Sequence, residues 1–301
     1  MQNYQKSLTM LNESSEKDKH VIAKIIFLAV IVLYAVMNAL PSDANAVQQL
    51  SDPKVLLMLK MGQIFFSILF FIMPPLLFAH YVSKQTTSYL KLSGSPDVIS
   101  TFLIAISIVL AMPLINWMGE INMQMHLPHF LNGLEQWMRK KEDDAAVLTE
   151  LLLKMDSPAS LTFNLFMVAL IPALGEELMF RGVVQRIFTE WTKNKHAGIW
   201  IAAALFSAVH FQFFGFFPRM LLGAMFGYFF VWSNSLWLPI AAHFMNNASA
   251  VILTYLSKQG VINFDPDKIG TENNTTIVII SGVLVAGFIF SIYRREKEIA
   301  E

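Results

Sequence analysis

The sequence predicts an all-α protein of the membrane, a polytopic bundle of about eight transmembrane helices, on three observations. Of its 301 residues 55% are hydrophobic and only 15% are charged, whereas soluble domains carry about 25% charged residues. Mean hydropathy is clearly positive, at +0.50. Apolar stretches of about 20 residues, the length that crosses a bilayer, recur along almost the whole chain. This pattern excludes a disordered chain and disfavours an ordinary soluble enzyme.

Charge and cysteine content exclude further classes of protein. The 22 basic and 22 acidic residues cancel, so no basic field exists that would indicate a nucleic-acid partner. The chain has no cysteine. Disulfides, a cysteine nucleophile, thiolate metal ligands and palmitoylation are therefore all excluded.

The apolar stretches divide the chain into five segments. Residues 1–20 form a polar leader, too long and too acidic for the start of a signal peptide, and 119–160 form the longest polar interval. Three helices are expected in 21–118, four in 161–256, and the last helix with a charged tail in 257–301. The eight expected spans are 21–40, 57–82 (interrupted by Pro74-Pro75), 98–118, 161–184, 198–214, 217–232, 236–256 and 276–293.

Three expectations concern the membrane surface and the orientation of the chain. Leu148, Leu151, Leu152 and Met155 follow helical spacing, which predicts an amphipathic helix lying at the surface in the polar interval. The adjacent charged run 139–144 is expected to be a solvated face. Basic residues are modestly more frequent in the loops on the side of the two termini. We therefore expect an integral protein of the cell (inner) membrane with both termini in the cytoplasm.

Three ionisable residues, Glu176, Glu177 and Arg181, lie in the middle of the fourth expected span. Each costs at least ~2.5 kcal/mol to insert, which makes an intramembrane charge a candidate functional residue. Glu177 and Arg181 share a helix face and can form an ion pair. A structural pair that locks helices together explains these two as well as a chemical role does. Glu176 points about 100° away and has no local partner, which favours a catalytic role.

Two further apolar spans contain polar side chains. His210 lies in the fifth, and His243 and Asn247 share one face of the seventh. A lone intramembrane histidine is more often a buried hydrogen-bonding residue than a catalyst, but buried polar groups in lipid must satisfy one another. We therefore expect the three polar faces to converge. Pro172 and Pro239 each lie four residues before a polar residue, where a kink could open a catalytic cavity within the bundle.

This set of side chains suits the attack of water on an amide. A carboxylate and a histidine can hold and deprotonate water, while a second histidine and an asparagine can donate to the oxyanion. A metal ion held by Glu176, His210 and His243, with zinc as the candidate, is the alternative, because two histidines and a carboxylate form a catalytic zinc set. No His-Glu-x-x-His pair is present. The sequence leaves activation by metal and activation by glutamate both open.

At these residues the chain resembles a known family. Glu176-Glu177-x-x-x-Arg181, then Phe206-x-x-x-His210, then His243-x-x-x-Asn247 are similar to the three motifs of the CPBP family. This family comprises the CAAX-protease and bacteriocin-processing (Abi) membrane proteins. The resemblance covers about 161–256, with the motifs in the family's order.

The resemblance implies an intramembrane endopeptidase that cuts a peptide bond near the membrane face. Its substrate would be a peptide or protein, lipid-modified in some members, in contact with membrane lipid. Members are often labelled metalloproteases, although CAAX-type members have also been argued to use glutamate without metal. The implied roles are water activation for Glu176 and His210, an oxyanion hole for His243 and Asn247, and support for Glu177, Arg181 and Phe206.

Two other function classes remain. One is a non-catalytic immunity or scaffold protein that binds a peptide in the same cavity. The other is a proton-coupled transporter, disfavoured because no inverted repeat is visible. The remaining polar residues have simpler expected roles: solvent exposure for His126 and His129, and extension to the membrane interface for Arg219. The aromatic run 211–217 is expected to contact lipid, pack helices, or line a groove for a lipid-like substrate.

Overall fold

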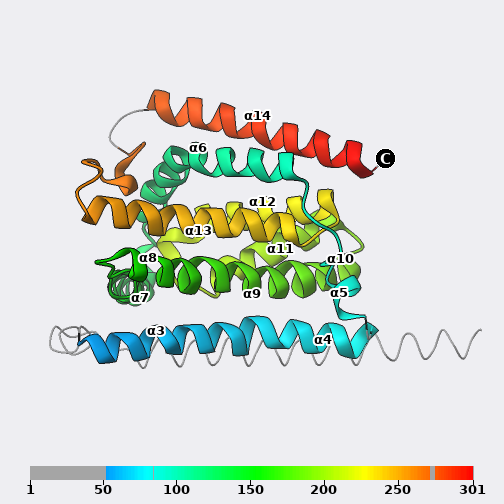
Figure 1. The fold of residues 1–301 in the computed structure, drawn as a ribbon. Helices are drawn as coiled ribbons and strands as arrows, with labels where there is room; N and C mark the ends of the chain where they lie inside the picture. The colour runs from blue at the N-terminus through cyan, green and yellow to red at the C-terminus, as the bar shows by residue number, and fades with distance from the viewer. Residues whose placement is uncertain (1–51, 84, 272–274, 301) are drawn as a thin grey trace, which may run out of the picture.

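The fold is that of a polytopic helical membrane protein, as the sequence predicts. The computed structural model describes residues 52–83, 85–271 and 275–300 (Figure 1), and all regular elements in those ranges are helices. The expected leader 1–20 and first span 21–40 lie outside the described residues. Five helices of the described part are long and apolar enough to cross a membrane, and they are Pro53–Ser83, Val98–Met123, Pro158–Thr192, Phe213–Ser233 and Thr275–Ile299.

The helices of the first half follow the expected order. The stretch expected at 57–82 consists of α3 (Pro53–Ser67), the π-helical turn η1 (Ile68–Ile72) and α4 (Met73–Ser83). The interruption expected at Pro74-Pro75 is thus a π turn directly before the prolines, after which the helix continues. The elements that follow are α5 (Thr86–Tyr89), α6 (Val98–Met123), η2 (His129–Leu131) and α7 (Asn132–Leu152).

The second half begins with a continuous helical rod that contains two π-helical turns. Its parts are α8 (Pro158–Asn164), η3 (Leu165–Leu170), α9 (Ile171–Met179), η4 (Phe180–Val184) and α10 (Gln185–Thr192). π turns occur often at functional sites, and α9 between them carries Glu176 and Glu177. The remaining elements are α11 (Lys195–Ala208), η5 (Phe213–Gly215), α12 (Phe216–Ser233), α13 (Trp237–Lys258), η6 (Pro266–Lys268) and α14 (Thr275–Ala300).

Two expected spans are absent from the five candidate helices of the described part, so the expected total of eight is not confirmed. α11 has only 14 residues, whereas a span needs about 20. It ends at Ala208, so the expectation of a helix to residue 214 is wrong. α13 is longer, but it carries His243, Asn246 and Asn247 in its middle, which lowers its hydropathy.

The long helices lie side by side and place α9 in the interior (Figure 1). α14 packs against α6, α6 against α13, α13 against α9, and α9 against η1 and α4. Seven of the nine residues of α9 are buried, Glu177 among them. The helix with the acidic pair therefore has protein on both sides and does not present its carboxylates to lipid.

Gly175 allows α9 to approach η1 closely. A Cβ atom at Gly175 would lie 2.9 Å from Phe71 Cβ and 3.1 Å from Ile72 Cγ1. Small residues serve this purpose in membrane helices, where packing rather than the hydrophobic effect drives association. The close contact fixes the position of the neighbouring Glu176 relative to η1.

The polar interval forms the expected amphipathic helix, although its charged face is partly buried. Leu151 is 3% exposed and Met155 is 7% exposed, the latter beyond the end of α7. The expectation of a solvated run at 139–144 is wrong in part. Lys141 is buried, and Glu142 Oε2 accepts a 3.1 Å hydrogen bond from the Phe214 N–H, because α7 packs against η5.

The start of α7 is organised by one carboxylate. Glu135 accepts a 2.8 Å hydrogen bond from the Leu127 N–H and further bonds from Arg139 and the exposed His126. The Leu127 N–H is the largest cause that lowers the pKa of Glu135 to about 2. His129 is exposed as well, so the expected exposure of both histidines is confirmed.

The contact at Gly175 yields a stability prediction. We expect Gly175→Ala to lower the free energy of unfolding by about 1–3 kcal/mol, because the added methyl group overpacks the contact with Phe71. The matched control is Gly62→Ala on α3, where a Cβ atom meets nothing within 4 Å. Alanine is the better helix former by about 0.8–1.0 kcal/mol, so the control should be neutral or stabilising. Thermal unfolding in detergent measures both, and equal midpoints would contradict the close contact.

Candidate active site

The structure brings the four expected catalytic residues to one cavity. Glu176 comes from α9, His210 from the turn after α11, and His243 and Asn247 from α13. The Nε2 atoms of His210 and His243 each lie 3.9 Å from Glu176 Oε2. All four residues line a cavity of about 630 Å³. The convergence of polar faces predicted from the sequence is confirmed.

A buried network stands behind this group. Glu177 is fully buried, and its Oε1 accepts hydrogen bonds from Arg181 Nη1 at 2.7 Å and His243 Nδ1 at 2.8 Å. The predicted Glu177–Arg181 ion pair is confirmed. The link from Glu177 to His243 adds a connection between α9 and α13 that helical spacing alone does not reveal.

The network fixes the orientation of His243. Its Nδ1–H donates to the Glu177 carboxylate at 2.8 Å, so Nε2 is directed toward Glu176. The ring stacks on Phe226 with centroids 5.4 Å apart and meets the edge of Phe206 at 5.8 Å. Packing and hydrogen bonding therefore leave this side chain a single orientation.

Phe206 contacts three members of the site, in keeping with its expected supporting position. The Arg181 guanidinium lies 4.8 Å from the centre of its ring, and the His210 ring packs edge-on at 5.1 Å. Arg181 also donates from Nη2 to the Gly223 carbonyl at 2.7 Å. Arg181 thus has both a carboxylate and a carbonyl partner, and its charge is compensated inside the bundle.

His210 lies in a turn, not on a helix as the motif spacing predicts. α11 ends at Ala208, and the His210 N–H bonds to the Ser207 carbonyl at 3.3 Å. Because the helix has ended, the Phe206 carbonyl is free to accept a 2.7 Å hydrogen bond from His210 Nδ1. Phe211 follows in the left-handed region at φ 53°. This geometry turns the chain and directs Nε2 of His210 toward Glu176.

Asn247 bonds to a backbone carbonyl to which the residue four positions on, a proline, cannot donate. Its Nδ2 donates to the Val168 carbonyl at 3.2 Å, and Val168 lies four residues before Pro172, which has no N–H. The neighbouring Asn246 donates to Asn247 Oδ1 at 3.1 Å, which fixes the orientation of the amide. Pro172 therefore affects the site through this carbonyl. Pro239 lies in the first turn of α13, where no helical hydrogen bond is lost.

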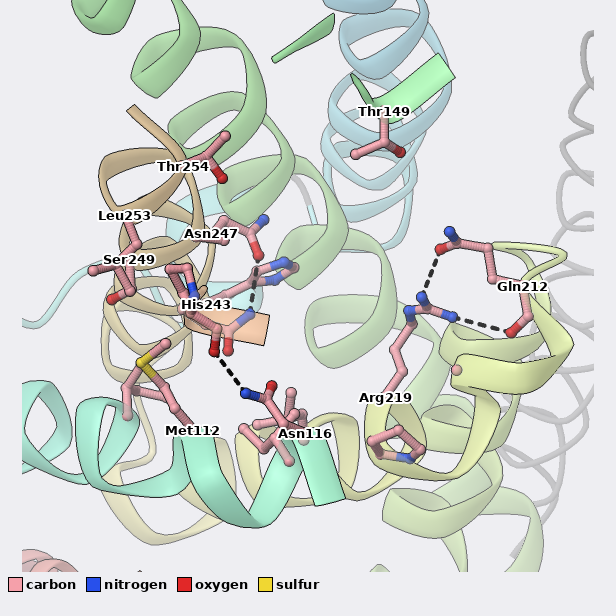
Figure 2. Close-up of a pocket in the computed structure, with 18 of the residues that line it drawn as sticks. Met112, Asn116, Thr149, Gln212, Arg219, His243, Asn247, Ser249, Leu253 and Thr254 are labelled. Atoms are coloured by element: carbon pink, nitrogen blue, oxygen red, sulfur yellow. Dashed lines mark hydrogen bonds between the residues drawn. The ribbon is translucent and has the colours of Figure 1, made fainter. Parts of the chain in front are cut away.

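The cavity also contains polar residues that the sequence reasoning missed. Arg219 lines it, and Figure 2 shows its guanidinium hydrogen-bonded to Gln212, on the other side of the cavity from His243 and Asn247. Asn246 is a further lining residue. The sequence did contain a signal for Arg219. It is a charged residue in an apolar stretch, and the same criterion identified Glu176. The expectation that it extends to the interface overlooked the cavity.

The expected metal ligands Glu176, His210 and His243 lie close together. Within the described ranges no group of three or more His, Asp or Glu side chains could hold a metal ion. Zinc binds nitrogen and oxygen ligands at about 2.0–2.2 Å, with the ligand atoms directed at one point.

The Glu177–Arg181 pair yields a second stability prediction. We expect Arg181→Met to lower the free energy of unfolding by about 3–5 kcal/mol, because it leaves a buried carboxylate without its cation. The matched control is Arg295→Met, which breaks the partly exposed 3.2 Å pair with Asp97 and should cost less than about 1 kcal/mol. Chemical unfolding in detergent compares them. Equal losses would contradict the central position of the pair, and adding Glu177→Gln to Arg181→Met should recover part of the loss.

Comparison with known proteins adds independent findings. Residues 158–249 match the family model described as Type II CAAX prenyl endopeptidase Rce1-like. The chain is 27% identical over 110 residues to the uncharacterized protein YpbD of Bacillus subtilis (strain 168), an alignment that covers 35% of this chain and 51% of that relative. The chain thus matches about half of that relative's length, and no solved structure matches it. The matched segment contains all three motifs, and the resemblance of this part of the chain to the CPBP family is confirmed.

Proposed function

We propose that the protein is an intramembrane endopeptidase of the CAAX-protease type, which hydrolyses a peptide bond near the membrane face. The observation that carries the proposal is the placement of Glu176 Oε2 at 3.9 Å from two histidine Nε2 atoms, inside a cavity of about 630 Å³. The family model over residues 158–249 supports the peptidase class.

The attacking water is held between Glu176 and His210. A separation of 3.9 Å is too long for a direct hydrogen bond, and a polar contact of this length suits a bridging water. His210 Nδ1 donates to the Phe206 carbonyl, so Nε2 of the neutral ring accepts from the water. Glu176 takes a proton from the water while the water oxygen attacks the peptide carbonyl. Glu176 then passes that proton to the leaving amine.

The oxyanion is stabilised from the α13 side of the cavity. The first donor that we propose is Nε2 of His243, which the bond between Nδ1 and the Glu177 carboxylate directs into the cavity. Asn247 Nδ2 provides a second donor, oriented by Asn246. Donors fixed before the reaction are worth most for charge that develops in the transition state. Glu177, Arg181 and Phe206 contribute by holding His243 in place.

The substrate we propose is a peptide or protein in contact with membrane lipid, with a prenyl-modified C-terminal motif as the first class to test. Apolar side chains of Ile108, Leu222 and Phe226 line the same cavity as the catalytic group. A cavity with both apolar and polar walls suits a peptide attached to a lipid chain. The family model's description, a CAAX prenyl endopeptidase, points to this class.

We further propose that the protein lies in the cell (inner) membrane with both termini in the cytoplasm. Basic residues occur at or near the ends of α5, α10 and α14, among them Lys91, Arg186 and Arg295. These ends lie together on one side of the bundle, where the C-terminus is also drawn (Figure 1). An excess of lysine and arginine marks the cytoplasmic side of a membrane protein.

Glu176→Gln tests the catalytic assignment. Purified protein in detergent is incubated with a synthetic farnesylated CAAX peptide, and the products are followed by mass spectrometry. We expect Glu176→Gln to reduce cleavage by at least ~10²-fold, since general base catalysis contributes about 10²–10⁴-fold. Glu150→Gln, at an exposed glutamate of α7, is the matched control and should cleave normally.

The controls of this test separate the candidate functions. Thermal unfolding must show that Glu176→Gln is folded before its activity is compared. Unchanged cleavage by the folded variant would reject Glu176 as the base. A wild-type protein that binds the peptide and never cleaves it would instead support the non-catalytic peptide-binding function.

Orientation is tested by single cysteines, for which the cysteine-free chain provides an unlabelled background. Lys195 at the start of α11 and Lys140 on α7 are both exposed. In whole cells a membrane-impermeant maleimide should label Lys140→Cys and leave Lys195→Cys unlabelled until the membrane is opened. The reverse pattern would place the termini outside the cytoplasm.

A further inference from the structure

Arg219 is a cation in the cavity wall whose hydrogen-bond partners are neutral. Its Nη2 donates to Gln212 Oε1 at 2.6 Å, and its Nη1 donates to the Gln212 carbonyl at 3.4 Å. Among the residues that the structure describes, no carboxylate lies within ion-pair distance of its guanidinium. Arg181, by contrast, is paired with Glu177 at 2.7 Å. Arg181 therefore has a carboxylate in direct contact, whereas Arg219 has only the neutral Gln212.

The surroundings hold Arg219 in place without a direct ion pair. A Cβ atom at Gly215 would lie 3.2 Å from Arg219 Nη2, so glycine leaves the space that the guanidinium occupies. The nearby Glu142 of α7 uses its Oε2 to accept from the Phe214 N–H, and burial raises the pKa of the Glu142 carboxyl. Arg219 interacts electrostatically with Glu142 first, and also with Glu176 and His210 across the cavity.

A partly buried cation whose hydrogen-bond partners are neutral favours an anionic ligand. Removing a charge from bulk water is costly unless an opposite charge compensates it. The planar guanidinium binds a carboxylate through two parallel hydrogen bonds, more strongly than it binds a neutral acceptor. A carboxylate that enters the cavity beside Glu176 would therefore find Arg219 fixed and with its charge available.

We propose that Arg219 binds the C-terminal carboxylate of the peptide substrate and so selects peptides cleaved near a free C-terminus. The inference rests on the proposed peptidase function. A CAAX motif stands at the C-terminus of its protein, which places a carboxylate close to the bond that is cut. Arg219 and Glu176 line one cavity, so scissile bond and carboxylate can be held together.

Lys258, the other lysine or arginine in the cavity lining, is too distant for this role. It follows His243 by 15 positions on α13, which corresponds to about 22 Å along a helix. The three residues of a CAAX tail that follow the cysteine span only about 10 Å when extended. Asp265 also lines the cavity, with Lys258 and Pro266, and adds a negative charge to that wall.

Binding measurements test the proposal without requiring turnover. The probes are a fluorescent farnesylated CAAX peptide with a free C-terminal carboxylate and the same peptide with a C-terminal carboxamide. Both are titrated against Glu176→Gln protein in detergent. We expect the carboxylate form to bind at least ~10-fold more tightly, since a charge-assisted bidentate pair is lost in the amide. Adding Arg219→Met should abolish this difference and leave binding of the amide unchanged.

Two further variants sharpen the comparison. Arg219→Lys keeps the charge but loses the bidentate geometry, so it should retain part of the preference. Lys258→Met removes the distant cation and should retain all of it. Unchanged binding of the amide by Arg219→Met shows that this variant is folded. If Arg219→Met is misfolded, the other two variants decide. A weaker preference for the carboxylate peptide in Arg219→Lys than in Lys258→Met supports the proposal, and equal preferences overturn it.

The possible outcomes distinguish this proposal from the proposed function. Equal binding of both peptides, or a preference that survives in Arg219→Met, overturns the role of Arg219 while cleavage is unaffected. A preference that depends on Arg219 in a protein that never cleaves the peptide supports the binding site and rejects the peptidase. Absence of binding by either peptide overturns both. In the active protein, Arg219→Met should raise KM for the carboxylate peptide and leave kcat within a few-fold.

Discussion

The carboxylate of Glu177 is the interaction on which the rest of the site depends. It is fully buried in α9 and accepts hydrogen bonds from Arg181, in the same helical rod, and from His243 on α13. Arg181 in turn donates a hydrogen bond to the Gly223 carbonyl on α12. Breaking such a group by removing one partner is costly because a charge is left uncompensated in a medium that cannot solvate it. Three helices are thereby held in one register. Glu176, the neighbour of Glu177, is left without such a partner and faces the cavity.

Irregular backbone provides the remaining contacts of the site. Pro172 cannot donate to the Val168 carbonyl one turn before it, and the end of α11 leaves the Phe206 carbonyl without a helical donor. Asn247 and His210 bond to these two carbonyls. In lipid an unpaired carbonyl costs several kcal/mol, so each irregularity favours the side-chain orientation that repairs it. The interruptions of regular helix therefore help to orient the polar side chains of the site.

Sequence reasoning predicted the helical class, the convergence of Glu176, His210, His243 and Asn247, and the Glu177–Arg181 pair, because charges in apolar stretches and helical spacing are local signals. It failed where tertiary packing decides. The spacing of Phe206 and His210 equals one helical turn, yet the chain has already left the helix. The charged run of α7 is partly covered by η5, and Arg219 faces a cavity that the linear sequence does not show. The first expected span lies outside the described residues, so that expectation stays a prediction.

The turn between α11 and α12 combines several of these features. It carries His210 and Gln212, and it is held from outside the bundle by Glu142, which binds the Phe214 N–H, and by Arg139, whose guanidinium lies 4.4 Å from the centre of the Phe214 ring. A helix outside the apolar core thus positions two residues of the cavity wall. Under the proposed function, substitutions on α7 therefore have a route to substrate choice that leaves the buried charge network untouched. In such a protein, selectivity and structural integrity can change independently of each other.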